Sequence, residues 1–284
     1  MALALIALVN DVPVLRVEAP PELSHARARI EAIDAKQLAA VVALTGTRDP
    51  GPAVPVVLAA EASEWAGRVP PWTAGFAIGG DLIVLFPARS PIYPHGTLED
   101  VLRHELAHVL IARTAAGHDV PRWFNEGLAM AAERPWGLVD RTRLVYELAF
   151  GQRLTLDDID RLFAGGRDEQ TRAYAVSGWF VRDLLNDHGS AVAGDLLALV
   201  GRGVPFDEAY ARATSVTLRS AELDFWRRQR TWTMWFPLVT STTVLWTVIT
   251  LLALYAGRRR RQRRAALRRR WAEEEASHEE NGAG

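Results

Sequence analysis

The sequence predicts an α+β fold: a small sheet-containing N-terminal lobe, a helical lobe and one transmembrane helix. The first ninety residues mix short β-type runs with one helix. Helical periodicity with capping residues follows from Thr97, and a long uncharged stretch ends at Ala256. We therefore divide the chain into an apolar N-terminus (1–13), an N-terminal lobe (14–92), a helical lobe (93–230), a transmembrane helix (231–257) and an arginine-rich cytoplasmic tail (258–284).

The composition is that of a chain with a buried core. Hydrophobic residues make up 49% and charged residues 24% of the 284 residues, which excludes a disordered chain. The net charge of −1 gives no attraction to nucleic acid, and the absence of cysteine excludes a disulfide framework and a cysteine nucleophile. All basic residues except Lys36 are arginines, which is typical of GC-rich bacterial coding.

The N-terminal lobe is expected to mix strands with one helix. Residues 2–9 are apolar but too few to span a bilayer, and they fit either an atypical signal sequence or a buried strand. The elements expected after them are a strand over 14–17, a helix over 21–44 closed by Gly46, a strand over 54–60, and a hairpin whose strands, 73–78 and 82–86, flank Gly79-Gly80-Asp81.

Capping residues predict the helices of the second lobe. Thr97, with Asp100 three residues later, predicts a helix that ends at Gly117. The other helices expected are one that starts at Pro121 and stops before Pro135, one over 169–188 closed by Gly189, and two more capped by Ser190 and Thr217.

The stretch 235–256 contains no charged residue. As a helix it would reach about 33 Å, enough to cross a bilayer, and the alternative is a buried core helix. Trp232 and Trp235 lie where an interfacial aromatic belt would be, and nine arginines follow between Arg258 and Arg270. The positive-inside rule then predicts a single-pass protein of the cell membrane, with a cytoplasmic C-terminus and the residues before Trp235 outside the cytoplasm.

The segment His104-Glu105-Leu106-Ala107-His108 carries the first chemical signal. Positions i and i+4 are neighbours on one helix face, so both imidazoles can bind one Zn²⁺. Glu105 lies beside them and can take a proton from a metal-bound water. The alternative interpretation of this motif alone is a pair of surface or core histidines.

A second segment contains a candidate for the third metal ligand. Its sequence is Trp123-Phe124-Asn125-Glu126-Gly127-Leu128-Ala129. A catalytic zinc takes three protein ligands and keeps one position open for water. Glu126 lies eighteen residues after His108 on the next expected helix. The sequence therefore predicts one zinc per chain, held by His104, His108 and Glu126.

These two segments resemble the gluzincin metallopeptidases, in particular the aminopeptidase-like branch of the peptidase MA clan. The resemblance covers about residues 14–230 and implies a thermolysin-like fold. It also implies hydrolysis of peptide bonds in peptide or protein substrates by a zinc-activated water, with Glu105 as general base. The segment 172–180 is similar to the family segment whose tyrosine hydrogen-bonds the oxyanion, which implies that role for Tyr174. An ordinary amphipathic helix residue is the alternative for Tyr174.

The sequence departs from the family pattern at two places. Thermolysin-like members carry an acidic residue four positions after the glutamate ligand, where this chain has Met130. Aminopeptidases carry an acidic motif that grips the substrate amine, whereas residues 74–80 hold no carboxylate. The second departure favours an endopeptidase, and by family analogy the strand before this hairpin could bind an extended peptide by β-addition. A catalytically inactive, membrane-tethered binding module and a membrane-surface adaptor that uses the arginine cluster are the competing hypotheses.

Overall fold

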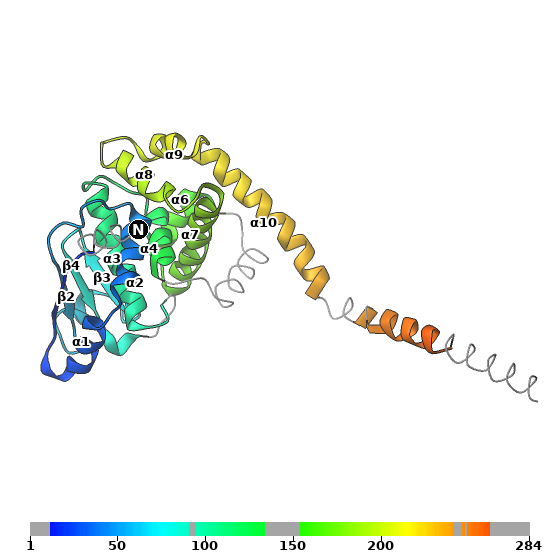
Figure 1. Cartoon of the computed structure of the whole chain (residues 1–284), viewed down its shortest axis with the longest axis horizontal. Helices are drawn as coiled ribbons and strands as arrows, with labels where there is room; N and C mark the ends of the chain where they lie inside the picture. Colours follow the sequence, from blue (N-terminus) through cyan, green and yellow to red (C-terminus); the bar gives the residue numbers. More distant parts are fainter. Residues whose placement is uncertain (1–11, 91–94, 134–153, 241–245, 248, 262–284) are drawn as a thin grey trace, which may run out of the picture. The chain divides into compact units, whose positions relative to one another are not determined.

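The computed structural model of the chain describes residues 12–90, 95–133, 154–240, 246–247 and 249–261 (Figure 1). The chain divides into two compact units, Met1–Arg228 and Gln229–Gly284. The strands are β1 (Leu15–Glu18), β2 (Val54–Leu58), β3 (Gly75–Ile78) and β4 (Leu82–Leu85). The α-helices are α1 (Ser24–Glu31), α2 (Ala35–Thr45), α3 (Leu98–Thr114), α4 (Arg122–Glu133), α6 (Leu156–Leu162), α7 (Arg167–His188), α8 (Val192–Val200), α9 (Phe206–Thr214) and α10 (Leu218–Thr240), and short 3₁₀ turns lie at η2 (Pro21–Leu23), η3 (Ala66–Arg68) and η4 (Pro87–Arg89).

The four strands form one mixed sheet in the order β1-β2-β4-β3. The β1–β2 and β2–β4 pairs are parallel, and the β3–β4 hairpin is antiparallel. β3 is therefore an edge strand, which pairs only with β4 among the described strands. One face of the sheet packs on α3, through a core that includes Val56, Ile83, Leu102 and Leu106.

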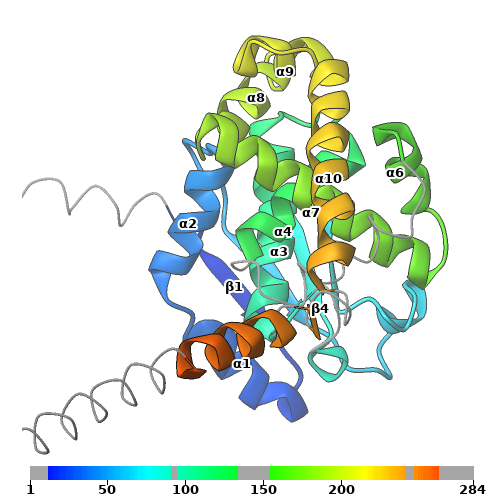
Figure 2. The same ribbon diagram turned by 90° about the vertical axis from the view of Figure 1, so that its right-hand side faces the viewer.

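A second core holds the helices together. It is rich in aromatic side chains, whose rings meet edge-on at 5.0 Å between Trp123 and Phe180 and at 5.1 Å between Phe124 and Phe206. α4 packs against both α3 and α7, as Figure 2 shows. This central position of α4 brings residues of three helices to one place.

Several local predictions are confirmed. Gly79 has a positive φ of 54° in the turn between β3 and β4, and β3 and β4 form the expected hairpin. Thr97 and Asp100 form the expected capping box at the start of α3. Gly46 closes α2 in the left-handed conformation that glycine adopts without strain.

Two local predictions are wrong. The single helix expected over 21–44 is split into η2, α1 and α2, because the backbone of Asp34 is extended and its carboxylate accepts a hydrogen bond from Lys36 N at 2.9 Å. Asp34 thereby acts as the N-cap of α2. Ser190 is not the cap of the next helix, since α8 begins at Val192 with Ala191 as its N-cap.

The predicted fold class is also wrong. The expectation was an α+β fold that ends in a transmembrane helix, whereas the described residues are mostly helical and carry one small four-stranded sheet. No helix in the described part of the chain combines the length and the apolar character needed to cross a bilayer. The described helix that enters the predicted span, α10, begins at Leu218, carries the charges of Arg227 and Arg228, and ends at Thr240.

Parts of the predicted organisation lie outside the described residues. They are residues 1–11 of the apolar N-terminus, residues 91–94 at the boundary between the predicted lobes, residues 134–153 of the helical lobe, residues 241–245 and 248 of the predicted span, and residues 262–284 of the tail.

Candidate metal centre

Helix α3 brings His104, Glu105 and His108 to the wall of a cleft. Another side of the helix packs in the apolar core that it shares with the sheet, through residues such as Leu102 and Leu106. His104 and Glu105 are themselves buried, at 2% and 4% exposure. Such burial of polar side chains requires partners close by.

Helix α4 supplies the main partner. Trp123 and Phe124 anchor its first turn in the aromatic core, and Asp160 accepts a hydrogen bond from Trp123 N at 2.6 Å. Glu126 follows one turn later and faces α3. Its Oε2 atom lies 3.4 Å from His104 Nε2 and 3.4 Å from His108 Nε2.

This arrangement fits a metal ion. The nearest ligand atoms of His104, His108 and Glu126 all lie within 4.8 Å of one another. Glu126 Oε2 is buried and has no hydrogen-bond partner within the described part of the chain. Two imidazoles and a carboxylate are a common donor set for Zn²⁺. The three residues expected from the sequence therefore come together in space with a suitable geometry.

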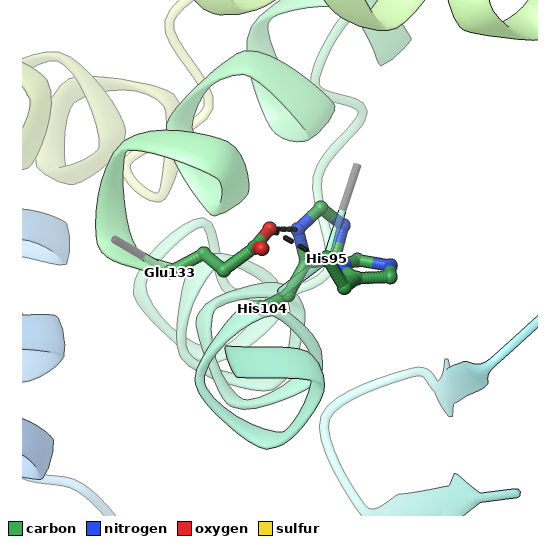
Figure 3. A group of neighbouring side chains, drawn as sticks. All are labelled: His95, His104 and Glu133. Carbon is green, nitrogen blue, oxygen red and sulfur yellow. Dashed lines mark hydrogen bonds and ion pairs between the residues drawn. The ribbon is translucent and has the colours of Figure 1, made fainter. Parts of the chain in front are cut away.

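The second nitrogen of each imidazole faces an acceptor. His108 Nδ1 lies 2.7 Å from Asn125 Oδ1, so Nδ1 carries the proton and donates to the amide oxygen. His104 Nδ1 lies 3.3 Å from Glu133 Oε2. Figure 3 shows the carboxylate of Glu133 pointing toward the two imidazole rings. When each imidazole is neutral and keeps its proton on Nδ1, Nε2 is the nitrogen with a free electron pair, directed toward Glu126.

The metal-free site is strongly coupled electrostatically. Burial alone would lower the pKa of His104, but the carboxylates of Glu126, Glu133 and Glu105 outweigh burial and raise it to about 10. Burial opposes a charge on His108 as well, yet Glu126 raises the pKa of that imidazole. Conversely, the imidazoles of His108 and His104 overcome burial and hold the pKa of Glu126 well below its usual range. Protons on the imidazoles thus balance the carboxylates in the metal-free protein, and a bound cation would displace them.

Glu105 lies beneath the edge strand β3. A side chain at Gly75 would come within 3.2 Å of Glu105 Cγ, 2.7 Å of Val101 Cγ1 and 2.9 Å of Leu85 Cδ2. Glycine at position 75 therefore lets β3 lie close against α3, over the carboxylate.

Tyr174 reaches the same place from α7. Its ring centroid lies 6.3 Å from that of His104, and the ring also packs edge-on against Phe163 at 5.2 Å. Burial and the charges of Glu126 and Glu105 raise the pKa of Tyr174 well above 10. The hydroxyl therefore stays protonated at neutral pH and is available as a donor.

The cleft has a volume of about 600 Å³. Its walls come from β3, from α3, from the start of α4 and from one face of α7 that includes Arg167, Gln170 and Tyr174. Trp72 donates a hydrogen bond from Nε1 to Gln170 Oε1 at 3.2 Å and so links the segment before β3 to α7. Among the described residues that line the cleft, the carboxylates are Glu105 and Glu126.

Three residues of the site were missed in the sequence. Asn125 and Glu133 contact the two histidines of α3, and His95 contacts Glu133. The sequence signal for Glu133 is its position seven residues after Glu126, two helical turns along the same face. Met130, at the position where the resemblance expects an acid, is buried, and Glu133 lies one turn further on against His104.

A family model matches the part of the chain that contains this site. The model of the Peptidase MA superfamily matches residues 36–230, well over half of the chain, and the match contains every residue of the site described above. No curated protein matches the chain. From the extent of the family match, the chain belongs to the Peptidase MA superfamily.

Proposed function

We propose that this chain is a zinc-dependent endopeptidase of the gluzincin type. The observation that carries the proposal is Glu126 Oε2, which is buried without a hydrogen-bond partner among the described residues and lies 3.4 Å from the Nε2 atoms of His104 and His108. A zinc ion bound to these three residues would supply a Lewis acid that polarises the substrate carbonyl and lowers the pKa of water.

Two protein side chains provide proton transfer and stabilisation of the oxyanion. Glu105 is not one of the three converging ligands, and it lines the cleft beside them. Its carboxylate accepts a proton from the attacking water and passes it to the leaving amine. The protonated hydroxyl of Tyr174 donates a hydrogen bond to the carbonyl oxygen as negative charge develops there.

The shape of the cleft supports an extended peptide substrate. β3 lies at the sheet edge, and its residues Gly75, Phe76 and Ala77 line the cleft. An edge strand presents backbone donors and acceptors that can pair with an added peptide strand. The substrate would lie antiparallel or parallel to β3, with its scissile bond above Glu105.

The charges of the cleft favour internal cleavage. With Glu126 as a metal ligand and Glu105 as the base, the described lining residues hold no further carboxylate for a substrate α-amine. Arg122, whose Nε lies 3.6 Å from Glu126 Oε1, would repel that amine instead. We therefore expect no requirement for a free N-terminus.

The test compares the wild-type chain with Glu105→Gln on a casein-type protein and on N-terminally blocked peptides. The expected result is cleavage of both substrates by the wild type, loss of nearly all activity in Glu105→Gln, and about one zinc retained in both proteins. Equal cleavage by the two proteins would contradict the role of Glu105. Binding of the peptides without cleavage by the wild type would favour an inactive binding module.

A further inference from the structure

His95 extends the contacts of the candidate metal centre by one residue. It lies shortly before α3, and its side chain is 9% exposed. His95 Nδ1 lies 3.0 Å from Glu133 Oε2, and its ring meets the ring of His104 edge-on at 4.8 Å (Figure 3). One carboxylate oxygen of Glu133 is thus shared by two imidazole nitrogens.

The group His95, His104 and Glu133 has donor atoms close enough to hold a metal of its own. It shares His104 with the group that contains Glu126, however. A neutral imidazole binds a metal through one nitrogen while the other keeps its proton. If His104 binds zinc through Nε2, its Nδ1 is a donor to Glu133, and the two groups form one site with an inner and an outer layer.

Glu133 needs more than one partner to stay in place as a buried anion, since it is only 2% exposed. His104 provides one contact at 3.3 Å, and the shorter contact comes from His95 at 3.0 Å. The backbone of Glu133 has a separate contact, since Arg103 Nε donates a hydrogen bond to Glu133 O at 2.6 Å. Two of the contacts that orient the side chain therefore come from histidines, and Arg103 holds the backbone at the end of α4.

We propose that His95 is a positioning residue that acts through Glu133 on His104. A hydrogen bond from His95 Nδ1 fixes the Glu133 carboxylate, which in turn accepts the Nδ1 proton of His104. That contact sets the tautomer and the ring orientation with which His104 presents Nε2 to the metal. The inference rests on the proposed zinc site, but its readout is metal affinity rather than peptide hydrolysis.

The experiment is a double-mutant cycle on the full chain with His95→Ala, Glu133→Gln and the pair. Zinc affinity is measured by chelator competition, and the visible absorption of the Co²⁺-substituted protein reports the ligand geometry. Glu133→Gln should weaken zinc binding by about 10- to 100-fold, as expected for a direct outer-shell partner. His95→Ala should weaken it by up to about tenfold and shift the Co²⁺ spectrum, because it acts one contact further out.

The double variant decides the matter. If His95 acts through Glu133, its removal adds almost nothing to the loss in Glu133→Gln. Additive losses would overturn the proposal, and so would unchanged zinc affinity and Co²⁺ spectrum in His95→Ala. A raised KM with unchanged zinc affinity would mean that His95, which also lines the cleft, contacts substrate instead.

Two further variants test whether the effect of His95→Ala is merely steric and whether replacing any histidine lowers zinc affinity. His95→Gln keeps an amide donor and should recover part of the zinc affinity lost in His95→Ala, whereas a purely steric role would give no such recovery. His118→Gln, at an exposed histidine outside the cleft lining, is the matched control and should bind zinc like the wild type. If the chain binds zinc as described but never cleaves peptides, the proposed function is wrong, but the double-mutant cycle still tests the role of His95 because it measures zinc affinity.

Discussion

Replacing Gly127 by alanine should force α4 and α7 apart. A Cβ atom at this position would lie 2.5 Å from the backbone oxygen of Ser177 and 2.6 Å from Val181 Cγ2. Ordinary contacts of a Cβ begin at 3.4 Å, so the helices must separate by about 0.9 Å. Because the nearest atom belongs to a helix backbone, no side chain can rotate away to relieve the clash.

The cost can be set against a matched control. Overpacking of a well-packed core costs about 1–3 kcal/mol, and each kcal/mol lowers the Tm of a domain of this size by about 2–4 °C. The loss of glycine freedom in the unfolded chain offsets up to about 1 kcal/mol of this. Gly67→Ala has the same offset without the clash, because nothing lies within 4 Å of a Cβ there and its φ is ordinary. The difference between the two variants isolates the contact of α4 with α7.

The functional effect should exceed the loss of stability. α4 carries Glu126 and α7 carries Tyr174, and a misplacement of about 1 Å at a reacting centre can reduce turnover by about 100-fold. Thermal unfolding of both metal-free variants, followed by peptide hydrolysis well below Tm, measures the two effects. The reasoning is refuted if Gly127→Ala unfolds within about 1 °C of Gly67→Ala, since the clash would then be relieved at no cost.

Three other predictions concern the site itself. Glu126→Gln should weaken zinc affinity by more than about 100-fold, which is beyond the loss typical of an outer-shell partner. The control Asp119→Asn, at an exposed loop position, should leave zinc affinity unchanged. Equal zinc affinities of the two variants in chelator competition would show that Glu126 is not a ligand. Tyr174→Phe should lower kcat by about 10- to 1,000-fold with KM little changed, and an unchanged kcat in steady-state assays would exclude the hydroxyl from catalysis. Zinc affinity should rise with pH between about 6 and 9. The pKa of His104 is raised to about 10 and that of His108 is raised as well, so zinc must displace protons from both imidazoles. This displacement becomes easier as the pH rises. The lowered pKa values of Glu126 and Glu133 contribute nothing in that range, so a pH-independent affinity would contradict the coupling.

The contacts around the metal centre also change how one mutation should be interpreted. Glu133 is close enough in sequence to Glu126 to look like a neutral acidic control. The structure places it 3.3 Å from His104 Nδ1 and 3.0 Å from His95 Nδ1. Glu133→Gln is therefore a perturbation of the site, and an exposed acid such as Asp119 is the proper control.

The sequence by itself determined the features that depend on local geometry. His104 and His108 share a face because an α-helix has 3.6 residues per turn, and Thr97 with Asp100 forms the capping box because both partners lie within four residues. The Gly79 turn and the Gly46 cap follow from the freedom of glycine at positive φ. Each of these predictions required only neighbours along the chain.

Only the tertiary structure decided which distant side chains meet. The approach of α4 to α3 brings Asn125 and Glu133 onto the two histidines, and the placement of His95 against Glu133 joins residues 38 positions apart. The sequence alone also did not show that Asp34 interrupts the first expected helix. Hydrogen bonds within one helical turn are fixed by backbone geometry, whereas contacts between helices depend on how whole faces pack. A motif can therefore identify the residues that point toward a metal, but the residues that hold those ligands in place are found only where α3, α4 and the segment before α3 converge.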